Sequence, residues 1–184
     1  IKLILNLRVD HKLADIQSME IISKDIDELF AKLQEKYSIV EYIEISTCNR
    51  KEYFIHNKHI PEDEELLSHE NKSIVIDYGQ SAVMHLLRMT SGLESMIVGE
   101  DQILGQVKEA HEYGMELGTT GVYLNTLFRY AVTGAKKVKT ETELSKTSVS
   151  TASLAIKKAD QELLGLEGKK VLIIGASGKI GSIV

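Results

Sequence analysis

The first part of the chain alternates apolar and polar positions in a way that is typical of β-strands. Leucines at alternate positions share one face of a predicted strand over 2–9, and polar residues lie largely on the other face. Three further short apolar stretches predict additional strands: 39–45, 53–55 and 74–76. A polar break at 46–50 separates two of these strands. The acidic, polar stretch 57–72 holds the only proline and is typical of a surface connection with one short helix.

Helical periodicity appears first near Ser23, which we predict as an N-cap because apolar residues follow at 26, 29, 30 and 33. From position 80 onward the pattern becomes mainly helical, and a glycine-bounded loop over 92–99 interrupts it. Two apolar stripes, over 103–117 and 124–138, predict helices that pack against other helices.

The end of the chain has a different pattern. Small residues over 148–159 predict one more helix, and two glycines then end it. A wholly apolar strand is predicted over 171–174, as in a buried parallel sheet, and it runs directly into a glycine turn of the form G-x-x-G-x-x-G. A glycine turn after an apolar strand is the context in which such a motif binds a nucleotide, so we predict the start of a Rossmann domain.

Composition narrows the protein class. With 184 residues, 43% hydrophobic and 27% charged, the chain fits one folded domain and part of another. No apolar run approaches the roughly 20 residues that span a bilayer, so we expect no membrane segment and a cytoplasmic protein. The net charge of -5 argues against a general nucleic-acid binder. That net charge still allows a local basic face. We predict that four lysines form a solvated helix face, and the alternative is that they contact RNA phosphates. They are Lys136, Lys137, Lys139 and Lys146.

The single cysteine, Cys48, excludes an internal disulfide and a multi-cysteine metal site, and we predict no metal. Most such cysteines are buried apolar residues. Here the neighbours Thr47, Asn49 and Arg50 are polar, which favours a reactive thiol. The planar guanidinium of Arg50 suits both a thiolate and the carboxylate of an acidic substrate, and a thiolate there suits attack on an acyl group.

Two further groups of residues are candidates for function. His85 lies on a predicted helix, where a histidine is more often structural; its functional role is acid–base chemistry near the thiol. The loop that leads into the helix at 103 carries several polar residues. They either begin a helix or form the wall of an amino-acid pocket, with Glu100 for an ammonium group and Ser95 and the glutamines Gln102 and Gln106 for polar atoms.

Three stretches of the chain resemble motifs of the glutamyl-tRNA reductase family. They are Ser-Thr-Cys-Asn-Arg at 46–50, the stretch from His85 through 92–107, and Lys-Thr-Glu-Thr at 139–142. The glycine turn lies where that family's NADPH domain begins, and His11 also fits. The resemblance covers essentially the whole chain in order. Asp101 departs from it, since the family usually has proline there, as do Ser177 and Gly178 in the glycine turn.

The resemblance implies an enzyme that reduces glutamyl-tRNA to glutamate-1-semialdehyde, the first step of five-carbon tetrapyrrole biosynthesis, with NADPH as the cofactor. Cys48 attacks the ester to form a thioester, and His85 is the histidine that matters for activity. The resemblance also implies two sets of binding residues. The substrate set is Thr47, Asn49, Arg50, Ser95, Glu100, Asp101, Gln102 and Gln106; the NADPH set is Gly175, Ala176, Ser177, Gly178, Lys179 and Ile180.

We therefore expect an α/β (α+β) catalytic domain with a small sheet and several helices over 1–145. A linking helix over 146–167 and the truncated start of the Rossmann domain over 168–184 follow. This fragment alone is expected not to complete the reduction. Expected partners are glutamyl-tRNA, a second copy of the full-length chain and the aminomutase that takes the product. The alternatives are a glutamyl-tRNA or amino-acid binding module without turnover and, last, an unrelated NADP-dependent oxidoreductase.

Overall fold

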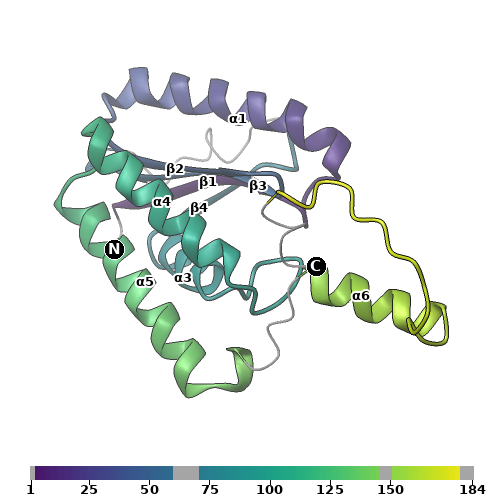
Figure 1. Cartoon of the computed structure of the whole chain (residues 1–184). Coiled ribbons are helices and arrows are strands. Elements are labelled where there is room, and N and C mark those ends of the chain that lie inside the picture. The colour runs from purple at the N-terminus through teal and green to yellow at the C-terminus, as the bar shows by residue number, and fades with distance from the viewer. Residues whose placement is uncertain (1–2, 60–70, 146–150, 179–184) are drawn as a thin grey trace.

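A computed structural model describes residues 3–59, 71–145 and 151–178 of the chain (Figure 1). Its strands are β1 (Ile4–Asp10), β2 (Glu41–Thr47), β3 (Arg50–His56) and β4 (Val75–Tyr78). Its helices are α1 (Ile16–Tyr37), α3 (Gln80–Thr90), α4 (Gln102–Leu117), α5 (Val122–Glu141) and α6 (Thr151–Glu162), and a short 3-10 helix, η1 (Glu143–Ser145), follows α5.

The four strands form one sheet in the order β2-β3-β1-β4, and every neighbouring pair is antiparallel. The strands β2 and β3 form a hairpin in which Thr47 pairs with Arg50. This register leaves only Cys48 and Asn49 in the turn. The small sheet with several helices confirms the fold predicted for the main part of the chain.

Helices cover both faces of the sheet (Figure 1). Helix α1 packs on one face, where alternate residues of β1 such as Leu5 and Leu7 join Ile26 and Phe30 in one apolar core. Helices α3, α4 and α5 cover the other face around a second core. Because both faces are covered, every residue of β3 is buried. Polar side chains on this strand are therefore held inside the protein, next to the hairpin turn.

Helix α1 begins earlier than the sequence pattern indicated. Its N-cap is Asp15, whose side chain accepts a hydrogen bond from the backbone N–H of Ser18 at 2.7 Å, and Ser23 lies inside the helix. Two more apolar residues, Met19 and Ile22, extend the buried stripe by a further turn. The prediction of Ser23 as the cap was therefore wrong, because an aspartate that caps a longer apolar stripe was available.

The predicted apolar strand at 171–174 is also absent. No strand occurs within residues 151–178 of the structure, and the four side chains are 39–91% exposed. A strand needs a neighbour for its backbone N–H and C=O groups, and no described residue supplies one. Pairing of this segment with the chain's own sheet is therefore ruled out, and pairing with another chain stays a prediction.

The remaining expectations fall partly outside the described residues. The helix predicted over 148–159 corresponds to α6, although 146–150 are not described. The short helix expected within 57–72 falls largely on 60–70, which are not described either. Among the described residues, no helix combines the length and the apolar character needed to cross a membrane.

Candidate active site

The β2–β3 hairpin presents Cys48 at its turn, where the thiol is exposed. The turn is held by local hydrogen bonds: the Asn49 N–H donates to Thr47 Oγ1 at 3.2 Å, and the His11 N–H donates to the Asn49 carbonyl at 3.0 Å. The segment after β1 therefore supports the turn. A cysteine at a rigid, exposed turn is available for reaction in a way that a core cysteine is not.

A cavity of about 260 Å³ opens beside this turn. It is lined by His11, Thr47, Cys48, Asn49, Arg50, Ser95, Met96, Ile97, Glu100, Gln102, Ile103 and Gln106. The hairpin turn, the loop after α3 and the first turns of α4 thus meet at one place. Eight of the ten residues predicted as catalytic or substrate-binding line this cavity, although they come from separate parts of the chain. The two that do not are His85 and Asp101.

Arg50 is fixed at the floor of the cavity, where its side chain is 3% exposed. Its Nη1 donates to Glu52 Oε1 at 2.7 Å, and its Nη2 donates to the Glu94 carbonyl at 2.7 Å. A guanidinium carries five N–H donors, so these two bonds leave others for an anion in the cavity. The position therefore suits recognition of a substrate carboxylate.

Glu52 connects Arg50 to His85. The Glu52 carboxylate is fully buried, and its Oε2 lies 2.8 Å from His85 Nε2 and 3.1 Å from Asn6 Nδ2. Burial alone raises the pKa of Glu52, but the hydrogen bond and charge of His85 and the charge of Arg50 outweigh it and lower that pKa. A carboxylate ionised in this way balances the buried Arg50. His85 does not line the cavity: it contacts Glu52, which contacts Arg50, and its ring stacks on Phe54.

Two buried polar atoms at the cavity have no hydrogen-bond partner within the described part of the chain: Ser95 Oγ and His11 Nδ1. A buried polar atom without a partner is costly, so such atoms at a cavity indicate a ligand or water. Partial burial lowers the pKa of His11; Asp10 opposes this shift, and Arg50 adds to it. The imidazole of His11 is therefore neutral near pH 7 and able to accept a proton.

Lys139 holds the loop that forms one wall of the cavity. Its side chain is 8% exposed, and Nζ donates to the Glu100 carbonyl at 2.8 Å, to the Gly99 carbonyl at 3.3 Å and to the Asp101 carboxylate. The interpretation of Lys139 as part of a solvated helix face was wrong. Its spacing from Ala135 and Ala131 places it on the buried stripe of α5. Asp101 is 74% exposed and contacts Lys139 instead of lining the cavity.

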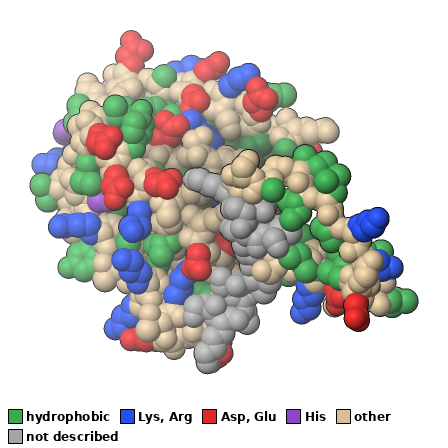
Figure 2. Space-filling model, in the orientation of Figure 1, with side chains coloured by type: hydrophobic (Ala, Val, Ile, Leu, Met, Phe, Trp, Pro, Cys, Tyr) green, Lys and Arg blue, Asp and Glu red, His purple; other side chains and the backbone are tan. Residues whose placement is uncertain are grey.

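The other lysines of the basic run differ from Lys139. Lys136 and Lys137 are exposed, as expected for a solvated helix face, and Lys146 lies outside the described residues. Acidic and basic side chains are interspersed on the face shown in Figure 2. That face therefore offers no broad basic surface for nucleic acid.

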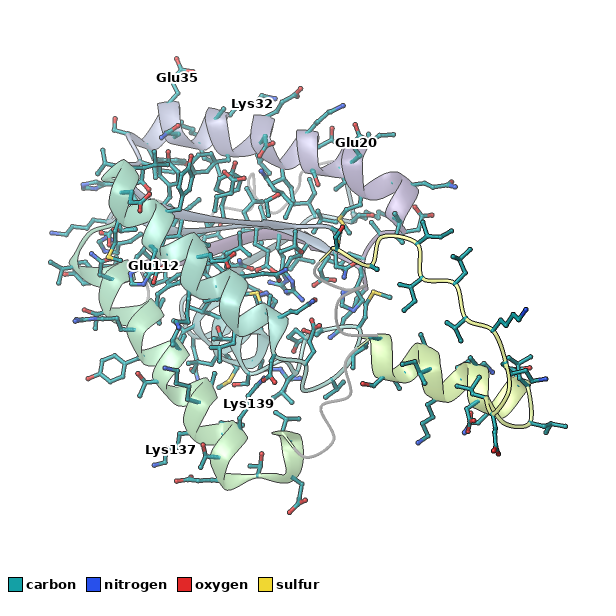
Figure 3. All side chains as sticks on the ribbon, in the orientation of Figure 1. Glu20, Lys32, Glu35, Glu112, Lys137 and Lys139 are labelled. Atoms are coloured by element: carbon teal, nitrogen blue, oxygen red, sulfur yellow. The ribbon has the colours of Figure 1, made fainter. Side chains whose placement is uncertain are left out.

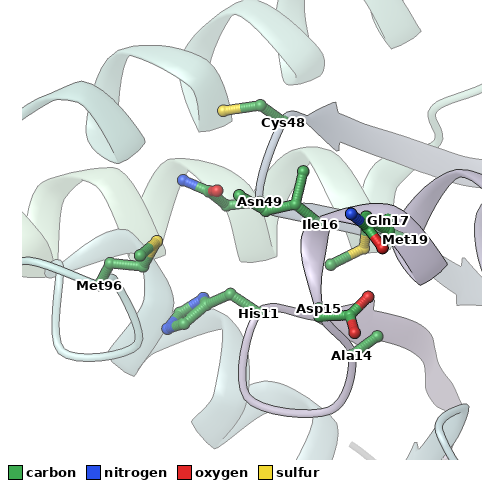
Figure 4. Close-up of a pocket in the computed structure, with 9 residues that line it drawn as sticks. All are labelled: His11, Ala14, Asp15, Ile16, Gln17, Met19, Cys48, Asn49 and Met96. Atoms are coloured by element: carbon green, nitrogen blue, oxygen red, sulfur yellow. The ribbon is translucent and has the colours of Figure 1, made fainter.

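A second cavity, of about 510 Å³, also has Cys48 and Asn49 of the turn in its wall (Figure 4). It is lined by His11, Ala14, Asp15, Ile16, Gln17, Met19, Cys48, Asn49 and Met96. Four residues line both cavities: His11, Cys48, Asn49 and Met96. In Figure 4, the side chains of Cys48, Asn49 and His11 point to the same side, toward Met96. No local sequence pattern indicated this second cavity, because its walls come from a loop, a turn and a helix start.

The described residues of the glycine turn, 175–178, form no nucleotide cradle. Gly175 has a φ of +81°, and its carbonyl accepts a hydrogen bond from the Gly178 N–H at 2.9 Å. The turn is exposed and has no sheet behind it in the described residues, whereas a phosphate loop needs a strand before it and a helix after it. Lys179 and Ile180 lie outside the described residues. Within residues 3–59, 71–145 and 151–178, no group of three His, Cys, Asp or Glu side chains could hold a metal ion.

Comparison with known proteins identifies the family. The sequence model described as "Glutamyl-tRNAGlu reductase, N-terminal domain" matches residues 7–142. The chain belongs to the glutamyl-tRNA reductase family. Its match to the glutamyl-tRNA reductase of Methanobrevibacter smithii is 57% identical over 182 residues, which is 99% of this chain and 45% of that protein. The match to the Methanothermobacter marburgensis protein of the same name is 40% identical, over 99% of this chain and 44% of that protein.

A solved structure of a member of the same family has a similar fold. The glutamyl-tRNA reductase from Methanopyrus kandleri superposes with a TM-score of 0.71 at 32% identity, over 88% of this chain and 40% of that one. The chain therefore spans less than half the length of the glutamyl-tRNA reductases that it matches. The family match over 7–142 includes both the Cys48 hairpin and the loop from α3 to α4, so it contains the whole lining of the first cavity.

Proposed function

We propose that this chain carries the catalytic, substrate-binding domain of an NADPH-dependent glutamyl-tRNA reductase, with glutamyl-tRNA as the substrate and glutamate-1-semialdehyde as the product. One observation carries the proposal. Within a chain of this family, eight residues predicted from sequence line one cavity that has an exposed thiol at its edge. In the proposed domain order, 1–145 is catalytic, 146–167 is the linker and 168–184 begins the NADPH domain.

The cavity lining suits a glutamyl group. Arg50 offers free N–H donors to the side-chain carboxylate, and its buried position strengthens that interaction. Glu100 provides a negative charge for the α-ammonium group, and Ser95 Oγ provides a buried polar atom that has no partner of its own among the described residues. Gln102 and Gln106 add amide groups from the first turns of α4. Asp101 enters the proposal only as the partner of Lys139.

The proposed acylation begins when Cys48 loses its thiol proton and Sγ attacks the carbonyl carbon of the glutamyl ester. The bond from that carbon to the ribose oxygen breaks, a proton moves to this oxygen, and tRNA leaves a glutamyl thioester on Cys48. His11 is the better placed of the two histidines for this proton transfer, because it lines the same cavities as Cys48 and its lowered pKa keeps it neutral. His85, predicted as the acid–base residue, acts in this proposal through Glu52 on the position of Arg50.

A thioester is more readily reduced than an oxygen ester, so the covalent step eases the one that follows. NADPH, when bound, supplies the hydride for that reduction. The residues proposed for its phosphates, Gly175 to Ile180, need a parallel sheet behind them, and no described residue provides it. We therefore assign no reduction step to the described residues. A homodimer and transfer of the product to an aminomutase remain predictions.

The test is an activity assay on the full-length gene product with glutamyl-tRNA and NADPH, in which semialdehyde is measured. We expect product from the wild type and none from Cys48→Ser. We expect His11→Asn to lower kcat and to flatten the pH profile. His85→Asn should mainly raise KM, because Arg50 is then less well held. If folded wild-type protein binds glutamyl-tRNA but forms no product, the proposal of a reductase is wrong and the alternative of a binding module without turnover is favoured.

A further inference from the structure

Cys48 lines two cavities, and the first one holds groups for only the glutamyl part of a glutamyl-tRNA ester. The carbonyl carbon that Sγ attacks carries the glutamyl group on one side and the ribose oxygen of the terminal adenosine on the other. The polar cavity of about 260 Å³ contains the groups suited to the glutamate. The nucleoside is bonded to the same carbon through the ribose oxygen, so it needs its own space beside Cys48, and the cavity of about 510 Å³ also has Cys48 in its wall.

We propose that this second cavity binds the terminal adenosine of the tRNA during acylation. This inference rests on the proposed function, and it assigns the larger cavity to the leaving group. Its volume lies in the range of small-molecule sites. The cavity takes only the end of the RNA, which fits a chain with net charge -5 and interspersed surface charges. Recognition of one base by stacking does not require a broad basic face.

The walls of the cavity have the chemistry that a purine needs. Three flexible or branched apolar side chains contribute to the walls, and two of them stand largely exposed: Ile16 is 78% exposed and Met96 62%, while Met19 is buried. These side chains offer an apolar surface beside the thiol, and methionine sulfur packs well against aromatic rings.

The polar groups of the cavity are few and well separated. The amides of Gln17 and Asn49 can reach the edge of a base or a ribose hydroxyl, and His11 stands at the junction where the ribose oxygen leaves. Asp15 also lines the cavity, but its carboxylate accepts from the Ser18 N–H as the cap of α1. Its negative charge disfavours a phosphate at that wall, so a base or ribose fits there better.

The experiment compares two matched variants of α1 in the full-length gene product. Ile16→Glu places a charge in the apolar wall of the cavity. Ile21→Glu places the same charge on the same helix, at a residue that is 65% exposed and does not line the cavity. Neither residue is buried, so both variants should fold, and the glutamate at position 16 lies in the first turn of α1, where the helix dipole favours a negative charge. Thermal unfolding checks this.

Acylation of Cys48 is then followed with two donors: glutamyl-tRNA, and the S-methyl thioester of glutamate, which has no nucleoside. We expect Ile16→Glu to slow acylation by glutamyl-tRNA roughly tenfold, about the contribution of one stacked base. The same variant should acylate from the small thioester within twofold of the wild type. Ile21→Glu should change neither rate. Equal losses with both donors, or no loss with either, would overturn the adenosine assignment.

Two further readouts separate this inference from the proposed function. Direct binding of the trinucleotide CCA needs no chemistry; we expect the wild type and Ile21→Glu to bind it and Ile16→Glu to bind it at least fivefold more weakly. Equal binding to all three proteins refutes the inference whether or not the protein is a reductase. If Ile16→Glu slows only the NADPH-dependent reduction of a preformed Cys48 thioester, the cavity belongs to the nicotinamide and not to adenosine. Absence of Cys48 acylation by either donor in the wild type counts against the proposed function alone.

Discussion

Replacement of Lys139 by methionine tests how the cavity wall is held. The ammonium group donates to two backbone carbonyls, those of Gly99 and Glu100, and to the Asp101 carboxylate. Lys139 lies toward the end of α5 (Figure 3), and its side chain is 8% exposed, so methionine keeps the apolar stem packed while it removes these three bonds. Hydrogen bonds to a charged group contribute about 1.5–3 kcal/mol each, and desolvation of the ammonium and the exposure of Asp101 offset part of this.

We therefore expect Lys139→Met to lower the free energy of unfolding by about 2–3 kcal/mol. For a chain of this size that corresponds to a fall in Tm of roughly 4–12 °C. Because the released loop carries Ser95 and Glu100, KM for glutamyl-tRNA should also rise. Urea unfolding and steady-state kinetics measure the two effects.

Lys137→Met is the matched control on the same helix. The Lys137 side chain is 70% exposed, and its Nζ lies 3.8 Å from Oε1 of Glu141. Such a surface pair contributes less than about 0.5 kcal/mol. Equal urea midpoints for the two variants would refute the reasoning, because they would mean that Lys139 holds nothing.

Three other predictions concern the same site. Glu52→Gln leaves the buried Arg50 without its anion, and it should cost about 3 kcal/mol in urea unfolding and raise KM for glutamyl-tRNA; an unchanged midpoint contradicts the network. Gly99→Ala should lower the Tm by roughly 2–10 °C, because Gly99 has a φ of +86° and a Cβ there would lie 2.8 Å from a backbone oxygen. The control is Gly105→Ala in α4, where a Cβ meets open space, and this change should be neutral or stabilising. Burial raises the pKa of Glu94, but its hydrogen bonds to Lys12 and Arg88 outweigh burial and lower that pKa to about 2. The contribution of Glu94 to folding stability is therefore complete above pH 4.5 and is lost as the pH falls toward 2. Glu94→Gln should cost roughly 1–2 kcal/mol at pH 7, since its partners are half exposed, and a gap that persists at pH 2 would count against this assignment.

The sequence was most informative where one local pattern decides the structure. Alternation predicted β1, short apolar stretches predicted the other three strands, and the polar break predicted the turn that presents Cys48. Periodicity predicted that the region after position 80 is helical, and it placed the loop that holds Ser95 between two helices. These features depend on residues that are close together in the chain, so they can be predicted from a single sequence.

The sequence was least informative where a residue's role depends on distant partners. Glu52 looks like an ordinary strand residue, and only the packing of helices on both faces of β3 buries it between Arg50 and His85. Lys139 was read with its lysine neighbours, although its four-residue spacing from Ala135 was a usable sign of burial. The segment 171–174 has the composition of a buried strand, but a strand forms only beside a partner.

The central claim is that Cys48 carries the glutamyl group. The most direct measurement is mass spectrometry of the full-length gene product after incubation with glutamyl-tRNA, with and without NADPH, with Cys48→Ser as the control. We predict a glutamyl adduct on the peptide that contains Cys48, no adduct in the variant, and conversion of the adduct to semialdehyde when NADPH is added. Folded wild-type protein that binds glutamyl-tRNA but forms no adduct on Cys48 would contradict the central claim.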